Sequence, residues 1–189
     1  MKKTSWYAVI LNAVCAFFLG CSFAGEESAP TEGVSVRVEN LRIDNYFVQG
    51  KNVQIFTEVP KRVLVVGDNE TETLIELGAA SSILLAAANN DGPFPMKEEN
   101  ARILETLPRA MNQQLHMEYV MQARPDLIIG WSHHFTPEAL GDVYSYADRG
   151  IGAYIVPATV RKGHPSLEET VYPFIKDMGH IFGVEERAA

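Results

Sequence analysis

Short apolar runs that alternate with helical segments constrain the fold of this chain more than any other feature of its sequence. Four of these runs are expected to form strands buried on both faces, at 62–67, 82–88, 126–130 and 153–156. Helical segments are expected in the intervals, at 69–78, 96–107, 116–123 and from 136 onward. Strands that alternate with helices are joined by right-handed crossovers, so the sequence predicts an α/β fold with a mostly parallel sheet and flanking helices.

Local signals define the ends of several elements. Two alternating segments, 34–40 and 52–58, predict a small antiparallel β-hairpin ahead of the sheet. Thr136 carries the hydroxyl of a helix cap and is followed by proline and glutamate, which predicts a helix start. A serine–glutamate capping box opens the last helix, 166–183, and Pro173 is expected to kink or interrupt that helix.

Residues 1–20 have the pattern of a signal peptide. A short, positively charged start precedes an uncharged, mostly apolar run over 6–19, which is shorter than the roughly 20 residues that span a bilayer. Cys21 follows Phe-Leu-Gly and resembles the lipidated Cys of a bacterial lipobox; alternatively, an ordinary signal is cleaved and Cys21 is incidental. Residues 21–33 have the composition of a flexible linker, and the folded domain is expected over 34–189. We therefore expect an extracytoplasmic lipoprotein.

Composition argues against several classes of function. The chain has 16 Lys and Arg against 24 Asp and Glu, a net charge of −8, and no long basic cluster, which argues against nucleic acid as a partner. It has only two Cys and no C-x-x-C pair, which excludes a disulfide framework and the common zinc and redox motifs. No nucleophile elbow, P-loop or H-E-x-x-H motif occurs. We therefore favour a binding protein over an enzyme and expect no cofactor and no resident metal.

The candidate site lies beyond the carboxyl ends of the predicted strands, where open α/β sheets bind their ligands. Aromatic, hydrogen-bonding and cationic residues follow these strands, a mixture that suits a bulky polar ligand. The candidate ligand-binding residues are Asn69, Asn90, Trp131, His133, His134 and Arg161.

Four of these candidates have a structural alternative. Asn69 is suited to cap the helix that follows it, and Asn90 lies in a turn-forming Asn-Asn-Asp-Gly stretch. Trp131 is also compatible with half-buried packing. Arg161 is either a solvated loop charge or a fork for an anionic group of the ligand.

The adjacent His133 and His134 allow a metal pair as an alternative to ligand binding. Neighbouring side chains on a strand point apart, however, and no acid or Cys lies at ligand spacing from them. A neutral, hydrogen-bonding His that faces the cleft is therefore the favoured interpretation.

Several segments together resemble the substrate-binding proteins of iron–siderophore, haem and vitamin B12 ABC transporters. They are VPKRVLVV at 59–66, ETLIELGA at 72–79, MEYV at 117–120, RPDLIIG at 124–130 and DMGHIFGVEERA at 177–188. The resemblance implies two α/β lobes joined by a rigid helical spine, with the ligand between them. This chain would be the Rossmann-like N-terminal lobe, with the second lobe missing because the product is truncated or split, or because the sequence is a fragment.

The resemblance also implies a partner and a function. Glu118 matches the surface Glu that docks on an Arg of the membrane permease in this family; its alternative is a solvated helix carboxylate. The sequence thus predicts the substrate-binding component of an ABC importer for a chelated iron, haem or corrinoid ligand. The alternatives are a lipid-anchored metal-dependent enzyme that uses Asp68, His133 and His134, and a single-lobe interaction module.

Overall fold

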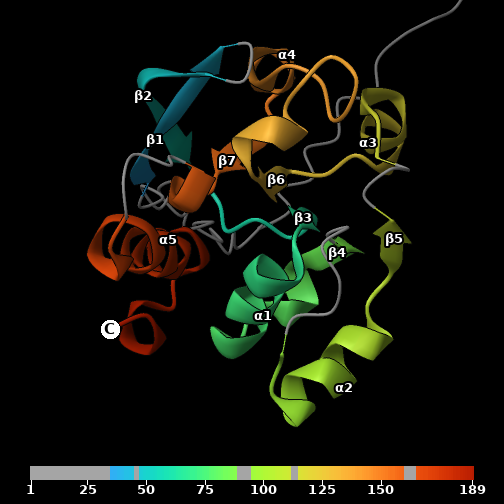
Figure 1. Cartoon of the computed structure of the whole chain (residues 1–189), viewed down its shortest axis with the longest axis vertical. Coiled ribbons are helices and arrows are strands. Elements are labelled where there is room, and N and C mark those ends of the chain that lie inside the picture. The colour runs from blue at the N-terminus through green and yellow to red at the C-terminus, as the bar shows by residue number, and fades with distance from the viewer. Residues whose placement is uncertain (1–34, 45–46, 89–94, 112–114, 160–164) are drawn as a thin grey trace, which may run out of the picture. The chain divides into compact units, whose positions relative to one another are not determined.

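The computed structural model describes residues 35–44, 47–88, 95–111, 115–159 and 165–189, which belong to one unit of the chain, Gly33–Ala189 (Figure 1). The predicted signal peptide and linker, Cys21, Asn90 and Arg161 lie outside the described residues. In the part of the chain that the structure describes, no helix has the length and hydrophobicity to cross a bilayer.

A five-stranded parallel sheet forms the centre of the unit, in the order β5-β4-β3-β6-β7. Its strands are β3 Val63–Val66, β4 Ile83–Ala88, β5 Arg109–Met111, β6 Leu127–Gly130 and β7 Gly152–Ile155. The predicted α/β fold with a mostly parallel sheet is confirmed. The short edge strand β5 was not predicted, because its three residues carry no apolar run.

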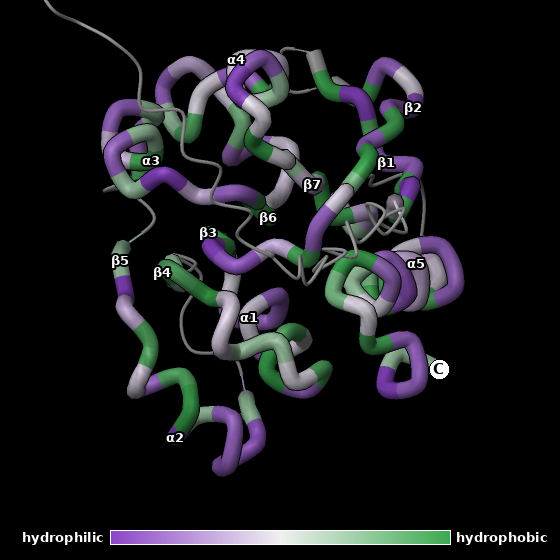
Figure 2. The backbone as a smooth tube through the Cα atoms, turned by 180° about the vertical axis from the view of Figure 1, so that it is seen from behind, coloured by the Kyte–Doolittle hydropathy of each residue, from purple (hydrophilic) through white to green (hydrophobic). Residues whose placement is uncertain are grey.

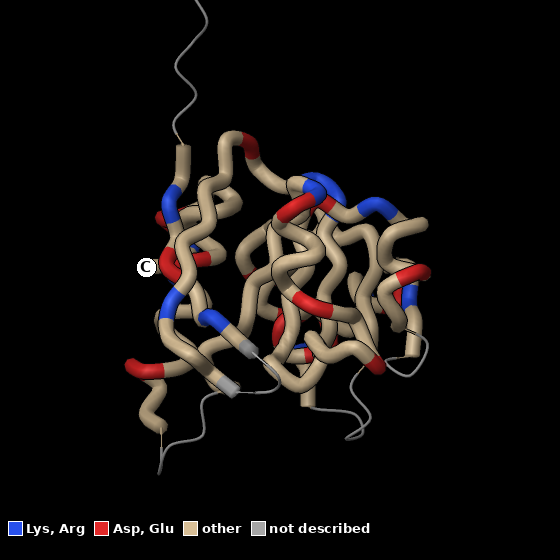
Figure 3. Tube along the Cα trace, turned by 90° about the horizontal axis from the view of Figure 1, so that it is seen from above, with Lys and Arg blue, Asp and Glu red and all other residues tan. Residues whose placement is uncertain are grey.

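Helices cover both faces of the sheet, which explains the continuous apolar runs of its strands. They are α1 Asp68–Glu76, α2 Glu98–Thr106, α3 Met117–Ala123, α4 Val143–Ala147 and α5 Leu167–Phe182. Val63 and Val65 pack in one core cluster with residues of α1 and α5, whereas Leu64 and Val66 pack in the other with residues of α3 and α4. Hydropathy along the backbone is drawn in Figure 2, and Figure 3 shows charged residues of both signs interspersed along the trace.

The hairpin of β1 Val36–Asp44 and β2 Phe47–Phe56 is antiparallel and longer than the sequence predicted. Its buried Asn40 bonds with the outer edge of β7: the side-chain amide donates to the carbonyl of Ala153 at 3.2 Å and accepts the N–H of Ile155 at 3.3 Å. A side-chain amide thus provides hydrogen bonds where a sixth strand would otherwise pair, and the sheet edge is covered.

One prediction about helices was wrong, and one of the two outcomes expected at Pro173 did not occur. The helix expected from Thr136 begins at Val143 instead, because Gly141 adopts a left-handed φ of 92° and Asp142 caps the helix through the N–H of Tyr144 at 3.1 Å. Pro173 does not interrupt α5, which continues from Leu167 to Phe182. The capping box at the start of α5 is confirmed. The buried apolar side of α5 packs against the core.

We expect Asn40→Leu to lower the free energy of unfolding by about 1–3 kcal/mol, because the N–H of Ile155 loses its partner inside the protein. Urea denaturation measures the change. Asn52→Leu is the matched control, since Asn52 lies directly opposite Asn40 on β2. Equal stability of the two variants would contradict the role of Asn40 at this edge.

Candidate functional site

The tips of β3, β6 and β7 lie side by side at the carboxyl edge of the sheet, because β6 pairs with both other strands. α1 begins directly after β3, Trp131 follows β6, and the 3₁₀ turn η4 Pro157–Thr159 follows β7. The structure thus brings together Trp131, His133 and His134 with Thr159, which follows the predicted strand at 153–156, and with Glu70, which was not among the candidates. We refer to these residues, together with Ser132, as the edge cluster.

Trp131 is half-buried and is held from two sides. Its indole Nε1–H donates to Oε1 of Glu70 at 2.8 Å, and its ring centroid lies 6.1 Å from that of His133. Part of the side chain packs against the core. Trp131 therefore packs against the core with one part of its side chain and leaves another part exposed.

His134 is the last residue of the 3₁₀ turn η3 Ser132–His134 and is buried, with 2% exposed. Its Nδ1 accepts the backbone N–H of Trp131 at 3.0 Å, which assigns the proton of the neutral ring to Nε2. Burial lowers the pKa of His134 to about 3, with a further contribution from the neighbouring His133. A Cβ on Gly130 would lie 3.1 Å from Nδ1, so the absence of a side chain there gives the ring its place.

Two hydroxyl groups join the tips of β6 and β7. The backbone N–H of Ser132 donates to Oγ1 of Thr159 at 2.9 Å, and that hydroxyl donates to Oγ of Ser132 at 2.8 Å. Both residues are half-buried. Together with the bond from Trp131 to His134, these contacts fix the main chain of the turn after β6.

Two acidic residues at this edge of the sheet, Asp68 and Glu70, lie in the first turn of α1. Asp68 forms an ion pair with Arg109 of β5 at 2.9 Å, and the side chains are 13% and 33% exposed. Burial raises the pKa of the Glu70 carboxyl group, and the hydrogen bond from Trp131 opposes part of that shift. No sequence pattern marked Glu70 or Arg109 as part of a site: one is an acid near a helix start, and the other is a lone cation after a proline.

Asn69 has a different environment from the edge cluster. It is exposed in the first turn of α1 and does not cap the helix, because the cap position is Gly67 with a φ of 128°. It lines a hollow of about 560 Å³ that also involves residues of α5 and the chain end. The helix-cap interpretation of Asn69 was therefore wrong.

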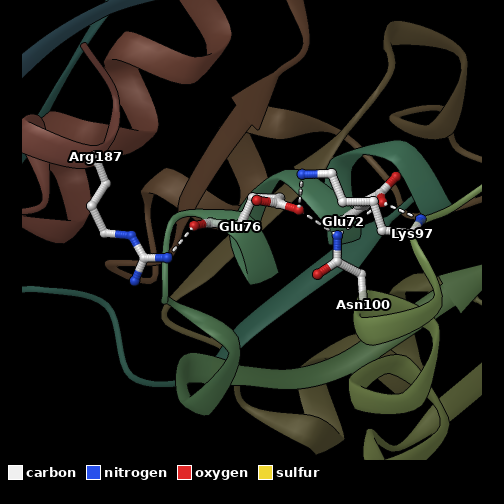
Figure 4. A network of polar contacts seen from close by, with 5 residues as sticks. All are labelled: Glu72, Glu76, Lys97, Asn100 and Arg187. Carbon is white, nitrogen blue, oxygen red and sulfur yellow. Dashed lines mark hydrogen bonds and ion pairs between the residues drawn. The ribbon is translucent and has the colours of Figure 1, made fainter.

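The polar network beside this hollow ties α1 to α2 and to the chain end (Figure 4). The buried Asn100 donates to Glu72 at 2.9 Å and to Glu76 at 2.6 Å. Lys97 Nζ lies 2.7 Å from Glu76, and Arg187 donates to the backbone carbonyl of Glu76 at 2.7 Å. The carboxyl groups of Glu72 and Glu76 are already hydrogen-bonded within the protein. We therefore interpret this network as a link between α1, α2 and the chain end.

Glu118 is exposed in the first turn of α3. Its neighbour Tyr119 is 39% exposed, and the ring of Tyr119 stacks on His116 with centroids 6.5 Å apart. Within the described residues, no group of three or more His, Cys, Asp and Glu side chains is placed to hold a metal ion.

Comparison with solved structures gives the fold relationship. The chain is similar to a periplasmic binding protein from Veillonella parvula DSM 2008, with a TM-score of 0.71, 23% identity, and coverage of 82% of this chain and 48% of that one. It is also similar to an ABC-type Fe³⁺-hydroxamate transport system protein from Saccharomonospora viridis DSM 43017, with a TM-score of 0.57, 21% identity, and coverage of 72% and 48%. No protein-family model and no curated protein matches the chain.

These similarities confirm the expected resemblance at the level of the fold. The chain shares the fold of periplasmic binding proteins and spans about half the length of the solved structures named above, 48% in both cases. This partial coverage fits the single lobe that the sequence predicts.

We expect His134→Asn to remove a pH dependence of stability. The folded state holds His134 with a pKa near 3, against an ordinary value of 6.5, so the unfolded chain binds the extra proton between these values. Wild-type stability relative to the variant should therefore fall as the pH drops below about 6.5, by about 1.4 kcal/mol per pH unit. Asn keeps an acceptor for the N–H of Trp131.

Urea denaturation at pH 7, 6, 5 and 4 measures this difference. His116→Asn is the control, because His116 is exposed at the start of α3. A constant stability difference between wild type and His134→Asn across this range would show that His134 is not held neutral.

Proposed function

We propose that this chain is the ligand-capturing lobe of an extracytoplasmic substrate-binding protein, which serves an ABC importer for a ferric siderophore, haem or corrinoid. The edge cluster carries the proposal. It places a half-buried indole and two half-buried hydroxyl groups at the carboxyl ends of parallel strands, where α/β sheets bind ligands, and the buried neutral imidazole of His134 supports their main chain. The fold shared with periplasmic binding proteins supports the same role.

Capture by this cluster needs no chemical step. Siderophore complexes, haem and corrinoids are bulky and combine apolar faces with polar rims. An indole offers a flat apolar surface, while the residues around it offer hydrogen bonds. Both solved structures named above belong to transport or binding proteins, which favours binding over the alternative of a metal-dependent enzyme.

A second lobe supplies the other wall of the cleft in the proposed arrangement. The chain spans about half of its structural relatives, so the lobe by itself contacts the ligand from one side. Asn90 and Arg161, which follow β4 and β7 in sequence, are proposed to extend the ligand surface at the same edge. Asn69 is proposed as a peripheral contact, on the evidence of its position beside Glu70 in α1.

The proposed location follows from the N-terminal sequence. Residues 1–20 direct export, Cys21 is lipidated, and residues 21–33 link the anchor to the folded lobe. This arrangement keeps the lobe near the permease on the outer side of the membrane. The acidic net charge of −8 supports a partner other than nucleic acid.

Ligand titration tests the proposal directly. In the full chain with Trp6→Phe, Trp131 is the sole tryptophan, and its fluorescence should be quenched saturably by ferrioxamine B, haemin or cyanocobalamin. Trp131→Phe, read by isothermal titration calorimetry, should weaken binding about ten-fold, because the larger ring surface is lost. Tyr172→Ala, which removes an exposed aromatic on α5, is the control and should leave binding unchanged.

Absence of saturable binding of all three ligands up to ~100 µM, a binding free energy weaker than about −5.5 kcal/mol, would exclude ligand capture by this lobe. Binding that is unaffected by Trp131→Phe would place the ligand away from the edge cluster.

Glu118 is the proposed contact with the permease, on the basis of its exposure and its position in α3. We expect Glu118→Arg to reduce the stimulation of ATP hydrolysis by the reconstituted importer at least ten-fold, because a like charge then faces the permease Arg. Ligand affinity should not change. Glu138→Arg, a change at another exposed position, is the control; equal effects of the two variants would contradict a specific contact at Glu118.

A further inference from the structure

Burial of the Glu70 carboxyl group, at the edge of the sheet where the strands end, costs folding free energy. Glu70 is 5% exposed, and its Oε2 has no hydrogen-bond partner within the described part of the chain. Its Oε1 accepts the indole N–H of Trp131 at 2.8 Å. An apolar side chain at this position of α1 would avoid the cost of burying an incompletely paired carboxyl group.

The bond between Glu70 and Trp131 connects two neighbouring strand ends. Glu70 lies in the first turn of α1, which begins directly after β3, and Trp131 follows β6. β3 and β6 are paired, with Val65 opposite Ile129. The bond therefore lies at the middle strands of the sheet, where the edge cluster is assembled.

The other contacts of this turn hold its main chain. His134 accepts the backbone N–H of Trp131, and Thr159 accepts that of Ser132. Neither contact restrains rotation of the indole about its side-chain bonds. The hydrogen bond to Glu70 does so, because it fixes the direction of Nε1 while the ring packs partly on the core.

We infer that Glu70 is a positioning residue for ligand capture: its carboxyl group holds the indole of Trp131 in the orientation that meets the ligand. A ring that is already immobilised loses less conformational freedom on binding, which increases affinity without an additional contact. The effect on affinity rests on the proposed function, whereas the effect on the ring is measurable in the ligand-free protein.

The test uses the full chain with Trp6→Phe, in which Trp131 is the sole tryptophan. Glu70→Leu removes the acceptor and keeps an apolar side chain of similar bulk, whereas Glu70→Gln keeps a carbonyl acceptor. In the ligand-free protein, Glu70→Leu should speed the local motion of the indole in time-resolved anisotropy and raise the acrylamide quenching constant about two-fold. Glu70→Gln should restore values close to those of the parent.

Binding of ferrioxamine B gives the second measurement. We expect its Kd to rise about three- to ten-fold in Glu70→Leu and to change less than two-fold in Glu70→Gln, as for the loss of one immobilised side chain. Glu105→Leu is the control, because Glu105 is exposed on α2. If Glu70→Leu does not fold cooperatively, Glu70→Met replaces it, since the thioether chain has similar length and is a much weaker acceptor.

The outcomes separate this inference from the proposed function. Unchanged indole motion and quenching in a folded Glu70→Leu or Glu70→Met protein would overturn the positioning role. Faster indole motion in these variants, combined with no ferrioxamine B binding by the parent, would support the restraint on the ring while contradicting its use for this ligand. Equal losses of affinity in Glu70→Leu and Glu70→Gln, with unchanged motion, would make Glu70 a direct ligand contact and also overturn the inference.

Discussion

Burial of the sheet on both faces is the constraint on which the other features of this molecule depend. β3 and β6 are buried along their whole length, between residues of α1 and α5 on one side and of α3 and α4 on the other. The side chains of these strands are therefore committed to packing. Polar groups that are able to contact a ligand are therefore left to the strand ends, where the edge cluster lies.

Patterns within a few residues predicted most of the fold. The continuous apolar runs located β3, β4, β6 and β7, and the capping box located the start of α5, because each signal depends only on nearby residues. The helix expected from Thr136 failed for a local reason as well: Gly141 takes a left-handed conformation, and the following Asp142 supplies the cap. β5 was missed because an edge strand of three residues has too few positions for a period.

The site was predictable only in part, because some of its members are defined by pairing across the fold. Trp131, His133 and His134 follow a recognisable strand, so their common edge could be derived from topology. Glu70 has the sequence environment of an ordinary helix-start acid, whereas in the folded chain it is buried and accepts the indole N–H of Trp131. Arg109 likewise becomes part of the edge through its ion pair with Asp68.

A half-buried carboxyl group on α5, that of Asp177, provides a contrast with the environment of Glu70. Asp177 of α5 accepts the hydroxyl of Tyr154 at 2.6 Å, and burial raises the pKa of Asp177 as it does that of Glu70. Tyr154, however, is 1% exposed within β7, so that bond joins a helix to the interior of the sheet. The partner of Glu70 is a half-buried ring at a strand tip, and one carboxyl oxygen of Glu70 has no partner within the described residues. The same type of bond thus stabilises packing in one place and restrains an accessible aromatic side chain in the other.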